Sequence, residues 1–427
     1  MKKSIKVLFA VVCLSLFTAL AFSACGNGGS SADEDAIHLT WWKLNDHIDT
    51  AGMNQIIESF QATYPNVTVE VAGHSNETLH QNLQISAMND TLPSMWFQWG
   101  GALGGRYVEY GVTRDLTQFA QEAGWHNRFT AASLELMTLH GQLAFYPRVM
   151  NALVVYYNRE IFADLGLTAP NTMAEFHNAV ETIHAAGIIP INTASVPGWH
   201  IMRIWEQFLE HYAGAAQHDQ LQIFAVDWEG NQAVINSFAT LQRYAQSGFF
   251  PPGFISMEAA DLTMLFYPGQ AAMVIEGQWM DNSILNDNQD LSRFGYFALP
   301  NGGTNRVSAF GEGFQFNRNL TDEEFRMAIA FLDHFHQASY AEQFPSMYGS
   351  PMPLIGATDA MPAHLLNAPS ILATASTNGA FTINDQALPA IVVDELFATM
   401  DYVSLGTVTP EEAASRMQRA IERHQAE

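Results

Sequence analysis

Tryptophans stand next to amide and charged side chains just after two predicted strands in this 427-residue chain. Trp42, Lys43 and Asp46 follow the first strand, and Gln98 and Trp99 follow the second. A tryptophan ring offers a flat apolar face, carboxylates accept hydroxyl protons, and amides and cations donate hydrogen bonds. This combination suits a ligand ring with apolar C–H faces and a rim of hydroxyl groups, which is the chemistry of a sugar. Each residue also has a structural explanation, because a strand tryptophan can pack in a core and a loop charge can simply be solvated.

Motifs for covalent or metal catalysis are missing from the sequence. It contains no Gly-x-Ser-x-Gly elbow and no His-Glu-x-x-His helix. The glycines between Gly101 and Gly105 lack the Lys-Ser/Thr pair of a phosphate-binding loop. His334 and His336 fall on a predicted helix, where residues two apart do not share a face. We therefore expect no catalysis, no metal and no cofactor.

The periodicity of apolar residues predicts an α/β protein. Residues 37–42 form a strand pattern, residues 53–64 a helix with its apolar residues on one face, and residues 67–71 an alternating strand. A β-α-β unit of this kind makes parallel strands with a right-handed crossover, and ligands bind at the carboxyl ends of such strands. The polar residues after Trp42 would therefore face a ligand site.

The most informative segment runs from Tyr156 to Phe176, with the sequence YYNREIFADLGLTAPNTMAEF. Local rules divide it into a strand end, a short helix, a turn and a second helix. Pro170 disfavours helical backbone in the residue before it. Thr172 and Glu175 form a capping box at the start of the second helix, and Gly187 supplies a left-handed stop at its end.

The order of residue types in this segment resembles the signature of one family. A second strong match is FYPGQAAMVIEGQWM at residues 266–280, and weaker matches lie at residues 93–116 and 294–300. By these motifs the chain is identified as a member of the extracellular solute-binding proteins of bacterial ABC importers. It is similar to the branch that carries sugars and resembles maltose-binding protein, and the resemblance covers nearly the whole mature chain.

The resemblance implies an α/β, two-lobed periplasmic-binding-protein-like fold (type II), with discontinuous lobes joined by a hinge. Chain crossings between the lobes are expected near Arg148, Gly313 and Gly349. The expected N-terminal lobe comprises residues 37–148 plus 314–349, and the C-terminal lobe residues 149–313 plus 350–427.

The resemblance also implies further ligand contacts. Trp279 occupies the position of a family aromatic residue that stacks on the sugar. Other candidates lie in a predicted loop or beside the predicted lobe crossings: Trp199, His200, Tyr146, Arg148 and Glu312. Packing in a loop or a core is the alternative role for each of them.

The N-terminus has the order of an export signal. Three lysines among the first six residues precede an apolar run at residues 7–22, followed by Ser23-Ala24-Cys25. The last four residues, FSAC, resemble a lipoprotein cleavage box, which implies a leader of residues 1–24 and a lipid on Cys25. An ordinary secretory leader is the alternative. Residues 25–36 are rich in Gly, Ser and acidic residues, a composition that predicts a flexible tether.

Charge and cysteine content narrow the function further. The formal net charge is −25, and removal of the three leader lysines makes it −28, which argues against nucleic acid and against an anionic ligand. Cys13 lies in the leader, so the mature chain has a single cysteine and forms no internal disulfide. An uncharged solute fits this composition best.

Our hypothesis from sequence is therefore a monomeric, lipid-anchored sugar-binding protein on the outer face of the cell membrane. It would capture an oligosaccharide between two lobes and deliver it to an ABC permease. The alternatives are an enzyme acting on polysaccharides, which needs two carboxylates about 5 to 9.5 Å apart, and a binding protein for a peptide or polyamine. A sensor that reports to a kinase or chemoreceptor would use the same lobes.

Overall fold

The structure is a computed structural model that describes residues 36–45, 50–303, 305–344, 347–348, 350, 352–355 and 365–426. The strands are β1 (Ile37–Leu44), β2 (Val67–His74), β3 (Met95–Trp99), β4 (Thr138–Leu139), β5 (Gln142–Leu143), β6 (Tyr146–Asn158), β7 (Ile189–Asn192), β8 (Ala271–Gly277), β9 (Phe294–Phe297), β10 (Val307–Phe316) and β11 (Ala380–Thr382).

The helices cover most of the remaining described chain. They are α1 (Thr50–Thr63), α2 (Asn76–Asn89), α3 (Gly101–Glu109), α4 (Thr117–Glu122), α5 (Ala131–Leu136), α6 (Arg159–Asp164), α7 (Met173–Ala185), α8 (Trp199–Gln222), α9 (Gln232–Gln246), α10 (Thr263–Phe266), α11 (Met280–Asn286), α12 (Asp322–Phe335), α13 (Ala338–Gln343), α14 (Ala368–Asn378), α15 (Asn384–Ala387), α16 (Ala390–Ser404) and α17 (Pro410–Ala426). Within the described ranges, no helix is both long enough and apolar enough to cross a bilayer.

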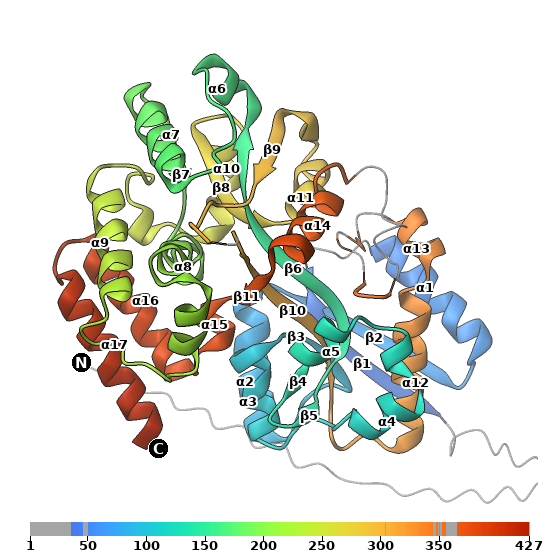
Figure 1. Cartoon of the computed structure of the whole chain (residues 1–427). Helices are drawn as coiled ribbons and strands as arrows, with labels where there is room; N and C mark the ends of the chain where they lie inside the picture. Colours follow the sequence, from blue (N-terminus) through green and yellow to red (C-terminus); the bar gives the residue numbers. More distant parts are fainter. Residues whose placement is uncertain are drawn as a thin grey trace, which may run out of the picture. The chain divides into compact units, whose positions relative to one another are not determined.

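One mixed sheet runs through the unit that begins at Ile37. Its strand order is β2-β1-β3-β10-β6-β8-β7, with β11 beside β10 and β9 beside β6 (Figure 1). β1 pairs in parallel with β2 and β3, and β7 pairs in parallel with β8. β10 runs antiparallel to both β3 and β6. The predicted β-α-β opening is therefore confirmed, with α1 as its crossover helix.

The predicted helix boundaries in the central segment are also confirmed. Thr172 caps α7, and its hydroxyl accepts the backbone N–H of Glu175 at 3.2 Å. The Glu175 carboxylate accepts the backbone N–H of Asn171 at 2.7 Å, one residue earlier than in a standard capping box. α7 ends at Ala185, and Gly187 follows with a φ of 77°. Local sequence signals thus set both ends of this helix.

Two strands take part in two different hydrophobic cores. In β6, Tyr146 belongs to a core built with β1, β3 and α12, whereas Leu153 belongs to a core built around α7, α8 and α9. In β10, Phe314 joins the first of these cores and Phe310 the second. The predicted crossings near Arg148 and Gly313 fall within these two strands, and Gly349 lies outside the described residues.

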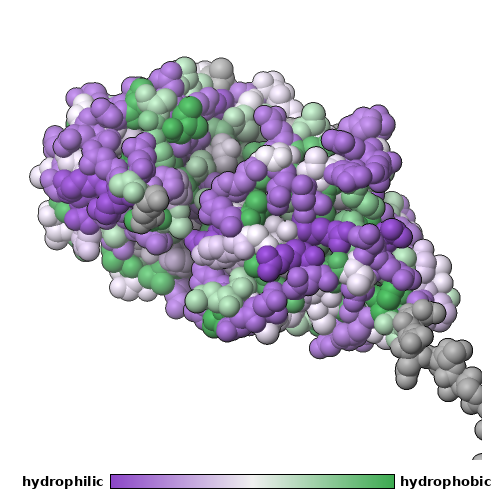
Figure 2. All heavy atoms as spheres, turned by 90° about the horizontal axis from the view of Figure 1, so that it is seen from below, coloured by the Kyte–Doolittle hydropathy of each residue, from purple (hydrophilic) through white to green (hydrophobic). Residues whose placement is uncertain are grey.

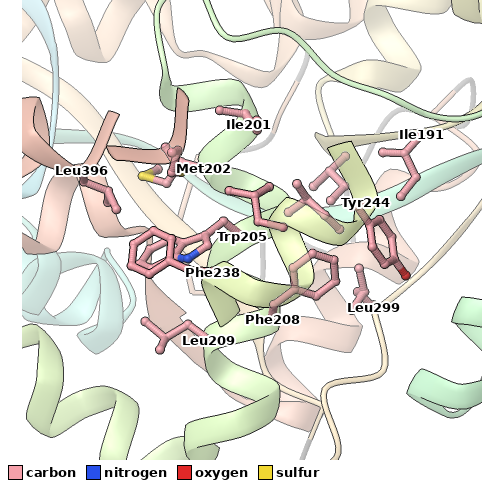
Figure 3. Packing of buried hydrophobic residues seen from close by; sticks show 14 of the residues in the cluster. Ile191, Ile201, Met202, Trp205, Phe208, Leu209, Phe238, Tyr244, Leu299 and Leu396 are labelled. Carbon is pink, nitrogen blue, oxygen red and sulfur yellow. The ribbon is translucent and has the colours of Figure 1, made fainter. Parts of the chain in front are cut away.

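Helix α8 forms the centre of the second core. Figure 3 shows Trp205, Phe208 and Leu209 of α8 packed among side chains from other elements, including Phe238 of α9 and Leu396 of α16. The rings of Trp205 and Phe238 stack with centroids 5.0 Å apart. Because this buried stripe fixes the helix, it also fixes the residues at its N-terminal end. The surface face in Figure 2 is mostly hydrophilic, with hydrophobic residues in small scattered groups.

Candidate ligand-binding cavity

A cavity of about 360 Å³ lies between elements that belong to the two cores. Its volume falls in the usual range for small-molecule sites, about 300 to 1,000 Å³. The lining residues come from distant parts of the sequence: Asn76, Glu77, His80, Gln84, Trp99, Ala102, Leu103, Arg106, Pro197, Trp199, Arg203, Phe310, Ile383, Asp385, Gln386, Ala390, Val393, Asp394 and Phe397.

The first wall is built by α2, α3 and the end of β3. The β3 ladder places Trp99 at the strand end, where its ring stacks on that of His80, with centroids 4.9 Å apart and an interplanar angle of 15°. Ser75 caps α2 by accepting the N–H of Thr78, so the helix presents His80 directly beside the strand end. Burial, together with the nearby Arg106 charge, lowers the pKa of His80 to about 4. At neutral pH the stack is therefore uncharged.

The second wall begins at the N-terminal end of α8. The Arg203 guanidinium lies 4.5 Å from the centre of the Trp199 ring and 5.5 Å from that of Trp279, within the range of cation–π contacts. Its Nη1 donates to the carbonyl of Ile275 at 3.1 Å and pairs with Glu276 Oε2 at 2.8 Å. The buried arginine is thus held between two tryptophans, with a carboxylate behind it.

The Glu276 carboxylate balances the charge of the buried Arg203 guanidinium. Its Oε1 lies 3.3 Å from His200 Nε2, and the other ring nitrogen of His200 is 3.1 Å from the Thr193 hydroxyl. Burial alone would raise the pKa of Glu276, but the Arg203 charge and the His200 contact outweigh it and hold the pKa at about 2. Burial lowers the pKa of His200. The cluster therefore keeps one carboxylate and one guanidinium charged behind the cavity wall.

The short helix α15 supplies Asp385 and Gln386 to the cavity. Burial raises the pKa of Asp385 to about 6, although the Arg203 charge opposes the shift. The Asp385 Oδ1 atom is buried and has no hydrogen-bond partner among the described residues. A buried carboxylate oxygen without a donor is unfavourable. This oxygen is therefore a strong candidate to accept a hydrogen bond from a ligand.

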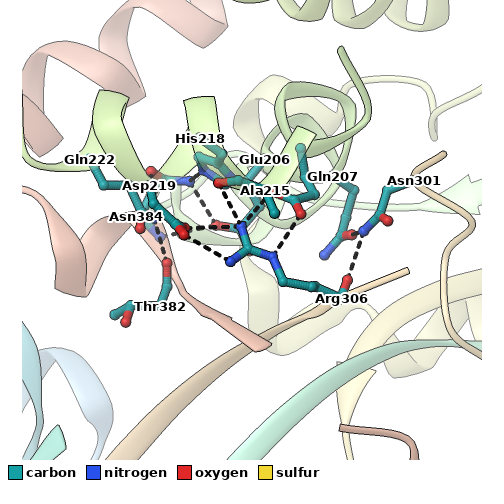
Figure 4. A network of polar contacts seen from close by, with 11 residues as sticks. Glu206, Gln207, Ala215, His218, Asp219, Gln222, Asn301, Arg306, Thr382 and Asn384 are labelled. Carbon is teal, nitrogen blue, oxygen red and sulfur yellow. Dashed lines mark hydrogen bonds and ion pairs between the residues drawn. The ribbon is translucent and has the colours of Figure 1, made fainter. Parts of the chain in front are cut away.

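A buried polar network fixes α15 against α8 (Figure 4). Oε2 of Glu206 accepts both the backbone N–H of Asn384, at 3.0 Å, and its side-chain N–H, at 3.1 Å. Burial raises the pKa of Glu206 to about 8. Nearby, the Arg306 guanidinium bonds Glu210 at 2.8 Å and Asp219 at 2.9 Å. Because Asn384 directly precedes Asp385, these contacts set where the Asp385 carboxylate lies.

Helix α16 adds a mostly apolar face. Ala390, Val393 and Phe397 recur at helical spacing and all line the cavity, with Asp394 beside them. Phe397 lies so close to Gly198 that a Cβ there would come within 2.5 Å of its ring. Aromatic faces, carboxylates, amides and aliphatic side chains therefore meet in one cavity. This set can hold an uncharged ligand that has both apolar faces and hydroxyl or N–H groups.

The predicted site residues divide into three groups. Trp99 and Trp199 line the cavity. Gln98, His200 and Trp279 lie behind its walls. Gln98 is fully buried, with its Oε1 accepting the Trp99 backbone N–H at 2.9 Å. Trp279 packs on Phe310 with centroids 5.7 Å apart.

The remaining described candidates do not line the cavity. Trp42 makes an edge contact with His74, and the buried Lys43 ammonium lies over the Trp41 ring at 5.0 Å. The Tyr146 hydroxyl donates to Asp333 at 2.7 Å within the first core.

Arg148 and Glu312 form an ion pair of 2.7 Å on the two shared strands. Glu312 pairs in register with Trp99, so the ion pair adjoins the cavity wall. Asp46 and Cys25 lie outside the described residues.

Three predicted loop segments were wrong in their local structure. β1 continues to Leu44, because its parallel ladder with β2 extends to the Leu44–His74 pair, so Trp42 and Lys43 lie in the strand. β3 likewise extends through Trp99 by pairing with β10. The expected loop after Gly198 is the first turn of α8, which places Trp199 and His200 on a helix.

Sequence reasoning missed several lining residues because their signals are weak. Asn76, His80 and Gln84 repeat every four residues and so form one polar face of α2. Arg203 follows Trp199 by one helical turn, which predicts that both share a face of α8. Asp385 has no local signal that separates it from other acidic residues. Each missed residue became apparent only where the elements converge.

The chain belongs to the bacterial extracellular solute-binding proteins, because the model of that family matches residues 45–334. A galactooligosaccharide-binding protein of Bacillus subtilis (strain 168) is 23% identical over 65% of this chain, and the match spans 63% of that relative's length. A multiple sugar-binding protein of Streptococcus mutans serotype c (strain ATCC 700610 / UA159) is 20% identical, over 79% of this chain and 80% of its own.

Solved structures show the same fold. A chitin oligosaccharide binding protein aligns with a TM-score of 0.81 and 25% identity, covering 92% of this chain and 100% of that one. The predicted two-lobed α/β fold of the solute-binding proteins is therefore confirmed. Membership of an extracellular family also makes the protein an exported one.

Proposed function

We propose that the protein captures a sugar in the cavity described above and delivers it to the membrane subunits of an ABC importer. The observation that carries this proposal is the meeting of two tryptophans, Trp99 and Trp199, from opposite walls with the carboxylates and amides of α2 and α15. Aromatic faces bind the C–H faces of a sugar ring, and carboxylates accept its hydroxyl protons. The sugars named for the relatives support the same class of ligand.

Capture would work by closure of two lobes, residues 37–148 plus 314–349 and residues 149–313 plus 350–427. The two cores, joined by β6 and β10, support this division. A ligand that contacts both walls favours the closed population and completes a surface that the transporter can recognise. In this proposal no bond of the sugar is broken.

Among the predicted contacts, we assign direct stacking to Trp99 and Trp199. Gln98, His200 and Trp279 would support these walls from behind. The Arg148–Glu312 pair adjoins Trp99 across the β10 ladder, where a longer saccharide could reach it. Trp42, Lys43, Asp46 and Tyr146 would then contact only a ligand that extends beyond the cavity.

The protein would work as a monomer held at the outer face of the membrane by a lipid on Cys25. Labelling of the expressing cells with a radioactive fatty acid tests the anchor. The label should enter the parent protein and be lost in Cys25→Ala. A labelled Cys25→Ala variant, or an unlabelled parent, would contradict the lipid anchor while leaving the sugar proposal intact.

Thermal unfolding of the chain from Ala32 onward against a panel of mono- and oligosaccharides tests the function. A ligand at 100 times its Kd stabilises the folded state by about 2.7 kcal/mol, which is readily measured. We expect stabilisation by a subset of neutral sugars and no release of reducing ends. Stabilisation only by peptides or polyamines would refute the sugar assignment, and release of reducing ends would point to an enzyme.

Two variants test whether the sugar binds in this cavity. Trp99→Ala and Trp199→Ala should each weaken binding at least ten-fold, because each removes a stacking face from one wall. Tyr402→Ala is the matched control, since it removes an exposed aromatic residue of α16 that does not line the cavity. Unchanged affinity in both tryptophan variants would place the ligand elsewhere.

A further inference from the structure

Two of the helices that flank the cavity, α2 and α16, differ sharply in chemistry. α2 contributes only polar side chains, whereas α16 contributes Ala390, Val393 and Phe397 with a single carboxylate, Asp394. Leu103 of α3 and Ile383, just before α15, extend the aliphatic surface. Aromatic rings suffice to stack on sugar rings, so these small aliphatic side chains indicate that the ligand also buries a methyl-sized apolar group.

An unsatisfied acceptor of the cavity lining lies next to this aliphatic surface. α15, which carries Asp385, contacts both α3 and α16 (Figure 1). The Asp385 Oδ1 atom is buried without a partner among the described residues. A ligand donor bonded to this oxygen would therefore sit within reach of the side chains that would hold the methyl group.

The charged residues of the cavity lining limit which substituent the bound saccharide can carry. Glu77, Asp385 and Asp394 line the cavity, and Arg203, one of its two arginines, is already paired with Glu276. This balance opposes a carboxylate on the ligand, as in a uronic acid. The aliphatic surface disfavours an ammonium group, because burial of a charge beside apolar side chains is costly. An uncharged substituent that joins a hydrogen-bond donor to a methyl group satisfies both the Asp385 carboxylate and the aliphatic surface, and an acetamido group is such a substituent.

We propose, building on the sugar-binding function above, that this cavity selects saccharides that carry an acetamido group. Its N–H donates to the Asp385 carboxylate, and its methyl group packs against Val393 and the neighbouring aliphatic side chains. Val393 then distinguishes acetamido sugars from hydroxyl sugars, and Asp385 anchors the substituent in either case. Trp99 and Trp199 bind the ring faces, which acetamido sugars share with their hydroxyl counterparts.

Calorimetry with matched ligand pairs tests the proposal on the chain from Ala32 onward. The pairs are N-acetylglucosamine and glucose, N-acetylgalactosamine and galactose, and diacetylchitobiose and cellobiose, which differ only by acetamido in place of hydroxyl. Glucosamine is added to the set, because it carries a charged ammonium group in place of the acetamido group. We expect the acetamido member of at least one pair to bind roughly four-fold tighter, because its methyl group is buried while either member can donate a hydrogen bond to Asp385.

Two outcomes overturn the proposal in distinguishable ways. If hydroxyl sugars bind as tightly as their acetamido partners, or if glucosamine binds tightest, the substituent is wrong while the sugar-binding function stands. If no saccharide in this set or in the broader panel binds, both the substituent and the proposed function fail.

Variants test which side chains of the cavity produce the preference for acetamido sugars. Val393→Thr replaces one methyl by a hydroxyl and should reduce the acetamido preference roughly four-fold, leaving affinity for the hydroxyl sugar unchanged. Asp385→Asn should weaken binding of both members of a pair about ten-fold, because each donates a hydrogen bond to this carboxylate. Val408→Thr, the same change as Val393→Thr at a partly buried site outside the cavity, is the control. An equal loss for both members of a pair in Val393→Thr, or no loss in Asp385→Asn, would show that these side chains do not contact the substituent.

Discussion

Replacement of Glu276 by glutamine should destabilise the folded protein in a pH-dependent manner. The change keeps the shape of the side chain and removes the negative charge that faces Arg203 and His200. The side chains of Arg203 and Glu276 are only 7% and 14% exposed, so solvent screens their interaction weakly. An arginine left without its partner in such a place typically costs about 3 to 5 kcal/mol.

The lowered pKa of Glu276 gives a second estimate of the free energy that its charge contributes to folding. The pKa falls from 4.5, the ordinary value, to about 2 in the folded protein. Each unit corresponds to about 1.4 kcal/mol, so the charged carboxylate contributes about 3 kcal/mol at neutral pH. A carboxyl with a lowered folded-state pKa stabilises the protein above its unfolded-state pKa. The contribution is therefore complete above about pH 5 and is lost as the pH falls from 4.5 towards 2.

Urea unfolding at a series of pH values measures this contribution. Fluorescence and circular dichroism transitions should coincide before a free energy is derived. The comparison keeps His200 in both proteins, because its contact with Glu276 helps to hold the pKa of that carboxyl at about 2. We expect a difference of about 3 kcal/mol between parent and Glu276→Gln at pH 7, shrinking towards zero near pH 2.

The exposed Glu258 provides the matched control. Glu258→Gln should change the free energy of unfolding by less than about 0.5 kcal/mol at every pH. If the Glu276→Gln difference were the same at pH 7 and pH 3, or no larger than that of Glu258→Gln, the ion pair would not stabilise the fold as argued here.

Three further predictions concern the elements around the cavity. Gly101 has a φ of 60° and an added Cβ would lie 2.2 Å from the Gln386 carbonyl oxygen, so Gly101→Ala should lower the melting temperature and weaken saccharide binding. Gly303→Ala, with no neighbouring atom within 4 Å, should do neither, and equal effects would contradict the role of this contact. Arg306→Met should cost about 3 to 5 kcal/mol in urea unfolding because Glu210 is only 3% exposed, whereas Arg419→Met, in an exposed pair, should cost less than about 1 kcal/mol. Thr321→Ala removes a complete capping box from α12 and should cost about 1 kcal/mol in the same assay, and no change would indicate that the cap is dispensable.

Local signals in the sequence predicted a substantial part of the fold. The start of α7 follows from Thr172, because a capping hydroxyl acts on backbone N–H groups within the next turn. The parallel pairing of β1 and β2 follows from a helix between two strands. The family followed from residue order in two segments, and the family match and the fold agree with it.

Strand ends were less predictable, for a physical reason. Lys43 and Trp99 were expected in loops because each stood just past the end of a predicted strand. Both remain in strands because partner strands continue to supply backbone hydrogen bonds, β2 to the first and β10 to the second. Pairing partners of a strand lie far away in sequence, so local composition does not fix where the ladder stops.

The sequence by itself determined the class of protein, the mixed α/β architecture and two tryptophans of the candidate site, Trp99 and Trp199. Only the tertiary structure decided which of these residues share a cavity. His80 meets Trp99, and Arg203 lies between Trp199 and Trp279, through packing of separate elements. Asp385 reaches the same cavity from near the C-terminal end because the buried contacts of Asn384 hold α15 in place. Such convergence depends on sheet order and core packing, which act between residues hundreds of positions apart and leave no pattern in any short stretch of chain.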